Sequence, residues 1–140
     1  MRWMGLDLGE KRIGIALSDP LGLTAGGHSY RKRSTLKADV AFFQQFMADH
    51  EVEGVVIGLP LNMNGTVGPA VVKARCFGES LHNATGKPVV FWDERLTTCA
   101  AQRLLIEADL SRSKRRQQVD KLAAVLILQN YLDSKSGIKN

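Results

Sequence analysis

The sequence has few of the features that mark zinc-binding, secreted or membrane-spanning proteins. Its two cysteines, Cys76 and Cys99, lie far apart and form no C-x-x-C pair, which indicates neither a zinc site nor a disulfide framework. The longest apolar run, Leu122 to Leu128, is too short to span a bilayer. Asp7 and Glu10 interrupt the segment where a signal peptide would need an apolar core. We therefore expect a cytoplasmic protein with reduced thiols and no membrane partner.

Other absences narrow the possible chemistry. The three histidines, His28, His50 and His82, are dispersed, so none is assigned to a metal or to proton transfer. Gly58 to Gly65 lacks the lysine that a P-loop places before its Ser/Thr, which excludes nucleoside triphosphate binding there. No internal repeat, low-complexity segment or aromatic base-stacking platform is evident.

Length and charge set the outer limits. A chain of 140 residues with 44% apolar content fits one domain, residues 1–140, around one core. Its 19 Lys+Arg outnumber 14 Asp+Glu, giving a net charge of +5. This balance suits a polyanionic partner such as nucleic acid, although many basic proteins bind nothing anionic.

The N-terminal segment predicts a β-hairpin with one carboxylate inside it. Two apolar runs, Trp3 to Leu8 and Ile13 to Leu17, flank the turn Gly9 to Arg12. Asp7 lies within the first run, where loss of hydration is costly unless a cation, a donor or protonation compensates. A metal ion is one such partner. The alternative is that Asp7 ends the strand and accepts hydrogen bonds from the turn amides.

The middle of the chain alternates between strand and helix patterns, which predicts βαβ crossovers. Ser34 or Thr35 is placed to cap the first helix, and Thr97 or Thr98 the third. The expected elements are an edge strand at 23–33, a helix from 34 or 35 to about 50, a strand at 53–60, a helix at about 70–84, a strand at 87–92 and a helix from 97 or 98 to about 108.

The tail joins a basic stretch, 111–118, to a nearly all-apolar run, 119–128. The first part is compatible with a solvated loop or a helical turn, and the second predicts a helix buried against the sheet. Asp120 shares a helical face with small alanines, Ala123 and Ala124, which permit close approach to the strands.

Acidic side chains thus come from three separate elements: Asp7, then Glu94 or Asp93, then Asp120. Carboxylate oxygens that converge select Mg²⁺ or Mn²⁺, and two such ions about 4 Å apart can promote phosphodiester hydrolysis. Each acid also has a structural alternative. Asp120 would be the N-cap of the last helix, and Asp93 and Glu94 would cap the helix that follows them.

Four blocks occur in an order that resembles a known family. They are Asp7-x-Gly9-x-Lys11-Arg12-Ile13-Gly14, Gly58-Leu59-Pro60-Leu61-Asn62-Met63-Asn64-Gly65, Asp93-Glu94-Arg95-Leu96-Thr97-Thr98 and Asp120-x-x-Ala123-Ala124. Together they resemble the YqgF family, also called RuvX, over essentially the whole chain.

The resemblance implies a ribonuclease H-like α/β fold, in which a mixed sheet with N-terminal antiparallel strands and βαβ crossovers is flanked by helices. It implies a metal-dependent nuclease, a hydrolase that processes the 5′ end of precursor 16S ribosomal RNA in ribosome biogenesis. Asp7, Glu94 and Asp120 match the family's catalytic and metal-binding acids, with Asp93 open as a substitute for Glu94.

Three alternatives stay open at this point. The first is a Holliday junction resolvase, which the family's similarity to RuvC suggests. The second is a non-catalytic nucleic-acid-binding module. The third is a relative of the actin-like ATPases, which share the Asp-x-Gly hairpin but need two such lobes. The sequence does not decide between a monomer and a homodimer.

Several residues near the acids are expected to contact the nucleic-acid backbone. Lys11, Arg12 and Arg95 are placed to meet phosphates, and the Asn62, Asn64 and Gly65 loop would present amide groups. The basic stretch would add phosphate contacts that position a substrate without reading its sequence. Its cationic residues are Arg112, Lys114, Arg115 and Arg116. The alternatives are ordinary solvated charge and a structural turn.

Overall fold

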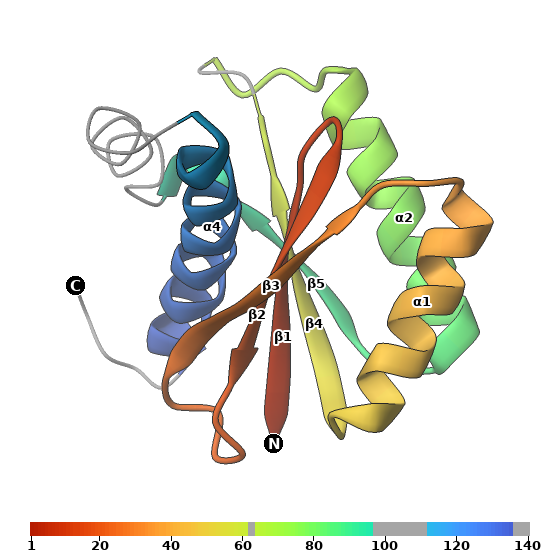
Figure 1. The fold of residues 1–140 in the computed structure, drawn as a ribbon, viewed down its shortest axis with the longest axis vertical. Helices are drawn as coiled ribbons and strands as arrows, with labels where there is room; N and C mark the ends of the chain where they lie inside the picture. The colour runs from red at the N-terminus through yellow and green to blue at the C-terminus, as the bar shows by residue number, and fades with distance from the viewer. Residues whose placement is uncertain (62–63, 97–111, 136–140) are drawn as a thin grey trace.

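The computed structural model describes residues 1–61, 64–96 and 112–135, with only the backbone described for residues 96 and 112–121 (Figure 1). The strands are β1 (Arg2–Leu8), β2 (Arg12–Ser18), β3 (Ala25–Lys32), β4 (Val52–Leu59) and β5 (Val89–Asp93). The helices are α1 (Leu36–Asp49), α2 (Pro69–Thr85), a 3₁₀ turn (Glu94–Leu96) and α4 (Arg112–Lys135).

The five strands form one mixed sheet in the order β3-β2-β1-β4-β5. The hairpin and the edge strand pair antiparallel, whereas β4 pairs parallel with both β1 and β5. The carboxyl ends of β1, β4 and β5 therefore meet at one edge of the sheet, called here the carboxyl edge. The opposite edge, where these three strands begin, is called the amino edge.

Helices cover both faces of the sheet, with α1 and α2 on one side and α4 on the other (Figure 1). Phe43, Phe77 and Ile57 belong to the core under α1 and α2. Val56, Ile127 and Leu128 belong to the smaller core under α4. The alternation of side chains along each strand sends neighbouring residues into different cores, so residues of β1 and β4 can be assigned to a face.

The start of α1 follows the predicted capping chemistry. Thr35 is the N-cap, and its hydroxyl accepts a hydrogen bond from the Ala38 amide at 3.1 Å. This bond satisfies one of the amides that the first helical turn leaves without a partner. The predicted cap and the end of the helix near His50 are both confirmed.

The last helix is longer than predicted. It runs over Arg112–Lys135, so the basic stretch is helical and Asp120 lies well inside the helix. The alternative in which Asp120 is an N-cap is therefore wrong. The helix predicted from Thr97 or Thr98 to about 108 lies outside the described residues. None of the described helices combines the length and the apolar character needed to cross a bilayer.

Candidate active site

Asp7 lies near the carboxyl end of β1, in the middle of the sheet. Its Cα pairs with Gly14 on β2, and the residue before it, Leu6, pairs with Ile57 on β4. Although it is charged, Asp7 is only 8% exposed. Leu6 and Leu8 pack on the α1 and α2 side, and strand alternation therefore directs Asp7 to the α4 side.

The position of α4 brings Asp120 toward the same edge. A Cβ atom at Gly5 would lie 2.7 Å from the Cβ of Leu128 and 2.9 Å from the carbonyl oxygen of Ala124. Nearer the start of β1, Trp3 packs on Tyr131 with ring centroids 5.1 Å apart. The helix thus runs antiparallel to β1 and approaches it closely at Gly5.

From the contact at Gly5, Asp120 on α4 and Asp7 on β1 lie at similar distances toward the carboxyl edge. Asp120 precedes Ala124 by four residues, about 6 Å along a helix. Asp7 follows Gly5 by two residues, about 7 Å along a strand. The backbone of Asp120 therefore lies toward the carboxyl edge, on the side of the sheet that Asp7 faces, while its side chain lies outside the described part of the chain.

Glu94 reaches the α4 side through Gly58. A Cβ atom at Gly58 would lie 2.6 Å from Ile127 Cδ1 and 3.0 Å from both Cγ and Cδ of Glu94. The Glu94 side chain therefore packs against the space that the missing Cβ of Gly58 leaves between β4 and α4. Leu6 on β1 pairs with Ile57 on β4, and Asp7 and Gly58 are the next residues of these two parallel strands. Asp7 therefore lies on one side of Gly58, and Glu94 lies against it as well.

Asp93 makes a different set of contacts. Its carboxylate binds the guanidinium of Arg95, with a shortest distance of 2.7 Å from Arg95 Nη2 to Asp93 Oδ2, and accepts the Arg95 amide at 2.9 Å. The Arg95 side-chain hydrogen bond is the main reason that the pKa of Asp93 lies below its usual range. Asp93 is thus a local partner of Arg95, whereas Glu94 lies at the Gly58 gap.

The predicted phosphate contacts are brought to this edge to different degrees. Arg95 faces Gly65, where a Cβ atom would lie 3.3 Å from Arg95 Nη1. Arg12, the first residue of β2, lies with its guanidinium 5.4 Å from the centroid of the Tyr30 ring, and Lys11 precedes it in the turn. Asn64 uses its side-chain oxygen to accept hydrogen bonds from the Thr66 amide and hydroxyl, as in a structural turn.

The remaining predicted contacts fall outside the described part of the chain. Asn62 is not described, and the four basic residues of α4 are described only as backbone. That backbone lies in the part of α4 that precedes Asp120 and so continues beyond the carboxyl edge.

Sequence reasoning missed two cations at the carboxyl edge, Arg33 and Lys73. Arg33 Nη1 donates to the Gly9 carbonyl at 2.7 Å, and both cations line a groove beside the hairpin turn. Neither belongs to a motif, since they come together only when β3 and α2 pack beside the turn. Lys73 had no signal beyond its charge.

The carboxylates of Asp7 and Glu94 suit a hard divalent cation. Carboxylate oxygens are the protein ligands that Mg²⁺ and Mn²⁺ prefer. Among the described side chains no three acidic, histidine or cysteine groups converge, so a metal site here needs the third acid from α4.

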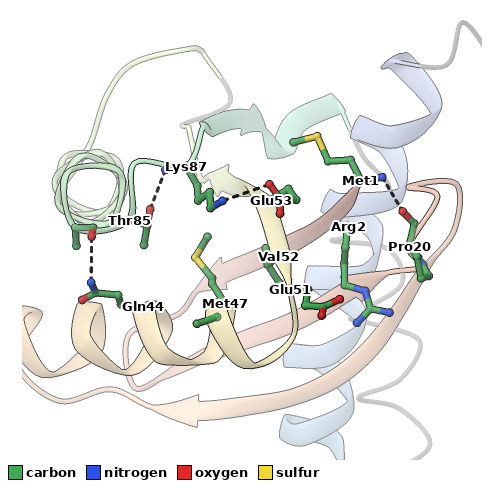
Figure 2. A pocket seen from close by; sticks show the side chains of 12 residues that line it. Met1, Arg2, Pro20, Gln44, Met47, Glu51, Val52, Glu53, Thr85 and Lys87 are labelled. Carbon is green, nitrogen blue, oxygen red and sulfur yellow. Dashed lines mark hydrogen bonds and ion pairs between the residues drawn. The ribbon is translucent and has the colours of Figure 1, made fainter.

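A hollow also lies at the other end of the sheet, the amino edge (Figure 2). Its volume is about 740 Å³, and it lies between the ends of α1 and α2 and the starts of β1 and β4. Gln44 bonds the Ala84 carbonyl at 3.1 Å across it, and Lys87 meets Glu53 at 3.3 Å. These contacts hold the surrounding elements together, and the two carboxylates that line the hollow, Glu51 and Glu53, are exposed.

A known family matches almost the whole chain. The family model for RuvX, described as Holliday junction resolvase, covers residues 1–134. The chain belongs to the RuvX family. RuvX relatives share about half of its residues over nearly their whole length. A protein of Syntrophomonas wolfei named "Putative pre-16S rRNA nuclease" is 56% identical over 97% of this chain and 96% of its own. One of the same name from Thermoanaerobacter pseudethanolicus is 54% identical over 98% and 99%.

Solved structures give the fold of this RuvX chain. Thermus thermophilus RuvC in complex with a Holliday junction substrate matches with a TM-score of 0.64 and 16% identity, over 99% of this chain and 98% of RuvC. The fowlpox virus Holliday junction resolvase matches with a TM-score of 0.58 and 13% identity, over 96% and 99%. These comparisons confirm the predicted family and the ribonuclease H-like α/β fold, and they support a nuclease as the class of enzyme.

Proposed function

We propose that this chain is a metal-dependent nuclease that processes the 5′ end of precursor 16S ribosomal RNA. The observation that carries the proposal is the buried Asp7 beside the Gly58 gap that admits Glu94, at the carboxyl edge of the sheet. The names of the RuvX relatives support the choice of RNA as substrate.

Asp7, Glu94 and Asp120 would hold Mg²⁺ or Mn²⁺. Such ions, when bound, activate a water molecule and stabilise the leaving oxygen of a phosphodiester. The fold would hold these acids in fixed positions, because Asp7 lies in a central strand and α4 packs closely on β1. Because Asp7 is poorly hydrated, a bound cation would in turn stabilise its charged form.

Basic residues around the acids would position the substrate. Arg95, held by Asp93, lies next to the Gly65 loop. Lys11 lies in the hairpin turn beyond Asp7, and Arg12 begins β2 directly after it. Phosphate contacts of this kind set the register of a strand without reading its bases. The basic start of α4 would extend these contacts on the other side of the acids.

The experiment is a competition between two substrates. Purified protein with Mg²⁺ or Mn²⁺ receives a fragment of the ribosomal RNA precursor and a mobile four-way DNA junction together. We expect cleavage of the RNA at its 5′ segment. Symmetric nicks in the junction, with the RNA left whole, would overturn the choice of RNA.

The resolvase is the second candidate, and the description of the matching family model favours it. A resolvase makes two symmetric cuts and therefore acts as a dimer with two sites facing one junction. The competition assay separates the candidates directly. A non-catalytic module would cleave neither substrate and would still bind nucleic acid.

A further inference from the structure

A second hollow lies at the carboxyl edge, on the side of α1 and α2. Its volume is about 730 Å³, and it lies between the hairpin turn after β1, the segment that leads from β3 into α1, and the first two turns of α2. It is called here the α2 groove. Pockets of this size hold a small ligand or a few units of one chain, so a nucleic-acid duplex would not fit inside.

Two cations and one carboxylate line the α2 groove: Arg33, Lys73 and Glu10. Arg33 is fixed by its bond to the Gly9 carbonyl. Lys73 is exposed, and it makes no hydrogen bond or ion pair with the described part of the chain. Both helices begin at the groove, and their first turns add partial positive charge. The lining therefore favours an anion.

The α2 groove lies next to the acids but on the other face of the sheet. Leu8 lines the groove, and Asp7, its neighbour in β1, faces α4. The hairpin turn, with Lys11 exposed in it, separates the two sites. A strand with one phosphate at Asp7 would reach the groove by crossing this turn.

We propose that the α2 groove binds the sugar-phosphate backbone of the substrate strand a few nucleotides away from the bond that is cut. This inference rests on the proposed function and deepens it. Arg33 and Lys73 are positioning residues, because they contact phosphates away from the reacting atoms. The ligand is a single strand of nucleic acid, which offers one negative charge per phosphate.

The first test measures binding without metal, so that no cleavage occurs. Fluorescence anisotropy follows labelled single-stranded RNA bound by wild type, Lys73→Ala and Lys73→Glu. For single-stranded RNA, each lost contact between a phosphate and a cation reduces the slope of log affinity on log salt concentration by about 0.7. We expect Lys73→Ala to lower this slope for a long RNA. The slope should not change for a fragment that is too short to extend from the acids to the α2 groove.

Arg75→Ala is the matched control. Arg75 is exposed on the same helix but does not line the groove, and the change removes the same charge. Glu10→Gln should act in the opposite direction and strengthen binding of the long RNA. Equal effects of Lys73→Ala and Arg75→Ala would overturn the proposal, since only general charge would then matter.

The second test uses Cys76, which is exposed and lines the groove. In a Cys99→Ser background, bound long RNA should slow the reaction of Cys76 with N-ethylmaleimide several-fold. Lys73→Glu should abolish this protection, and Arg75→Glu should retain it. If the RNA is cleaved but does not protect Cys76, the proposal that the α2 groove binds RNA would be overturned and the proposed function would stand. Protection without cleavage would support the groove and count against the nuclease.

Discussion

The two edges of the sheet teach different lessons about where a site lies. Each edge has a hollow of similar volume, about 740 and 730 Å³, but hydrogen bonds and an ion pair cross the hollow at the amino edge and hold its walls together (Figure 2). The carboxyl edge has a buried acid, Asp7, and a glycine that makes room for a second acid. The chemistry of the residues, rather than the volume of the hollow, is therefore the reason that we propose the site at the carboxyl edge.

Two buried carboxylates make the same comparison at the level of single residues. Asp39 is 2% exposed, and it accepts hydrogen bonds from Arg31 Nε at 3.0 Å and from the Ser34 amide at 3.1 Å. A cation from the chain itself therefore compensates its charge. Asp7 lies beside the gap that holds another acid, and two neighbouring carboxylates are an arrangement that suits a metal ion.

The largest effect is expected from Asp7→Asn. The change keeps the shape of the side chain and removes the charge that would hold the cation. Loss of a residue that hydrogen-bonds to a metal ligand typically lowers activity about 10–100-fold. We expect a larger decrease in the rate of cleavage here, because Asp7 would itself be a ligand. Gel assays of RNA cleavage measure this. The variant should melt no lower than the metal-free wild type, because nearby carboxylates repel one another. Undiminished cleavage would rule out the site.

Glu94→Gln and Asp93→Asn compare neighbouring acids at the end of β5. Glu94→Gln should lose most cleavage, since the carboxylate lies at the Gly58 gap. Asp93→Asn should mainly weaken substrate binding, because it loosens Arg95. The pKa of Asp93 is lowered, so its ion pair persists above the usual pKa of Asp and is lost only as the pH falls through the lowered value. A larger decrease of kcat in Asp93→Asn than in Glu94→Gln would reverse the assignment.

The basic start of α4 should govern salt dependence. Replacing Arg112, Lys114, Arg115 and Arg116 by alanine removes up to four cations that would pair with phosphates. For each such pairing removed, the slope of log affinity on log salt should fall by about 0.7 on a single strand and about 0.9 on a duplex. Nucleic-acid binding measured over a range of salt concentrations tests this, and an unchanged slope would make the stretch a solvated helical face.

A pair of glycines separates damage to the site from damage to the fold. Gly58→Ala and Gly54→Ala both introduce a methyl group into a filled space, against Ile127 and Glu94 in the first case and the Trp3 ring in the second. Each should cost about 1–3 kcal/mol of stability, measured by denaturant unfolding. Only Gly58→Ala should also reduce cleavage per folded molecule. Equal decreases in cleavage would remove the distinction between the edges.

Most of the fold could be predicted because its signals are local. Two apolar runs around a polar, glycine-containing turn indicated the hairpin, and Ser34 or Thr35 indicated the start of the first helix. The start of α4 could not be predicted, because residues 112–118 are charged and carry no apolar period. The choice between Glu94 and Asp93 also needed the structure, since they lie where the strand ends and alternation stops. The α2 groove depends on three segments that meet only after folding.

The most direct test of the metal site at the carboxyl edge is a titration of the metal-free protein with Mn²⁺, followed by amide NMR. Bound Mn²⁺ broadens the signals of nearby amides. We predict that amides at the carboxyl edge, such as Leu8 and Gly58, broaden first in wild type and stay sharp in Asp7→Asn. Broadening that begins at the amino edge, around Glu53 and Lys87, or that is unchanged by Asp7→Asn, would contradict a metal site built on Asp7.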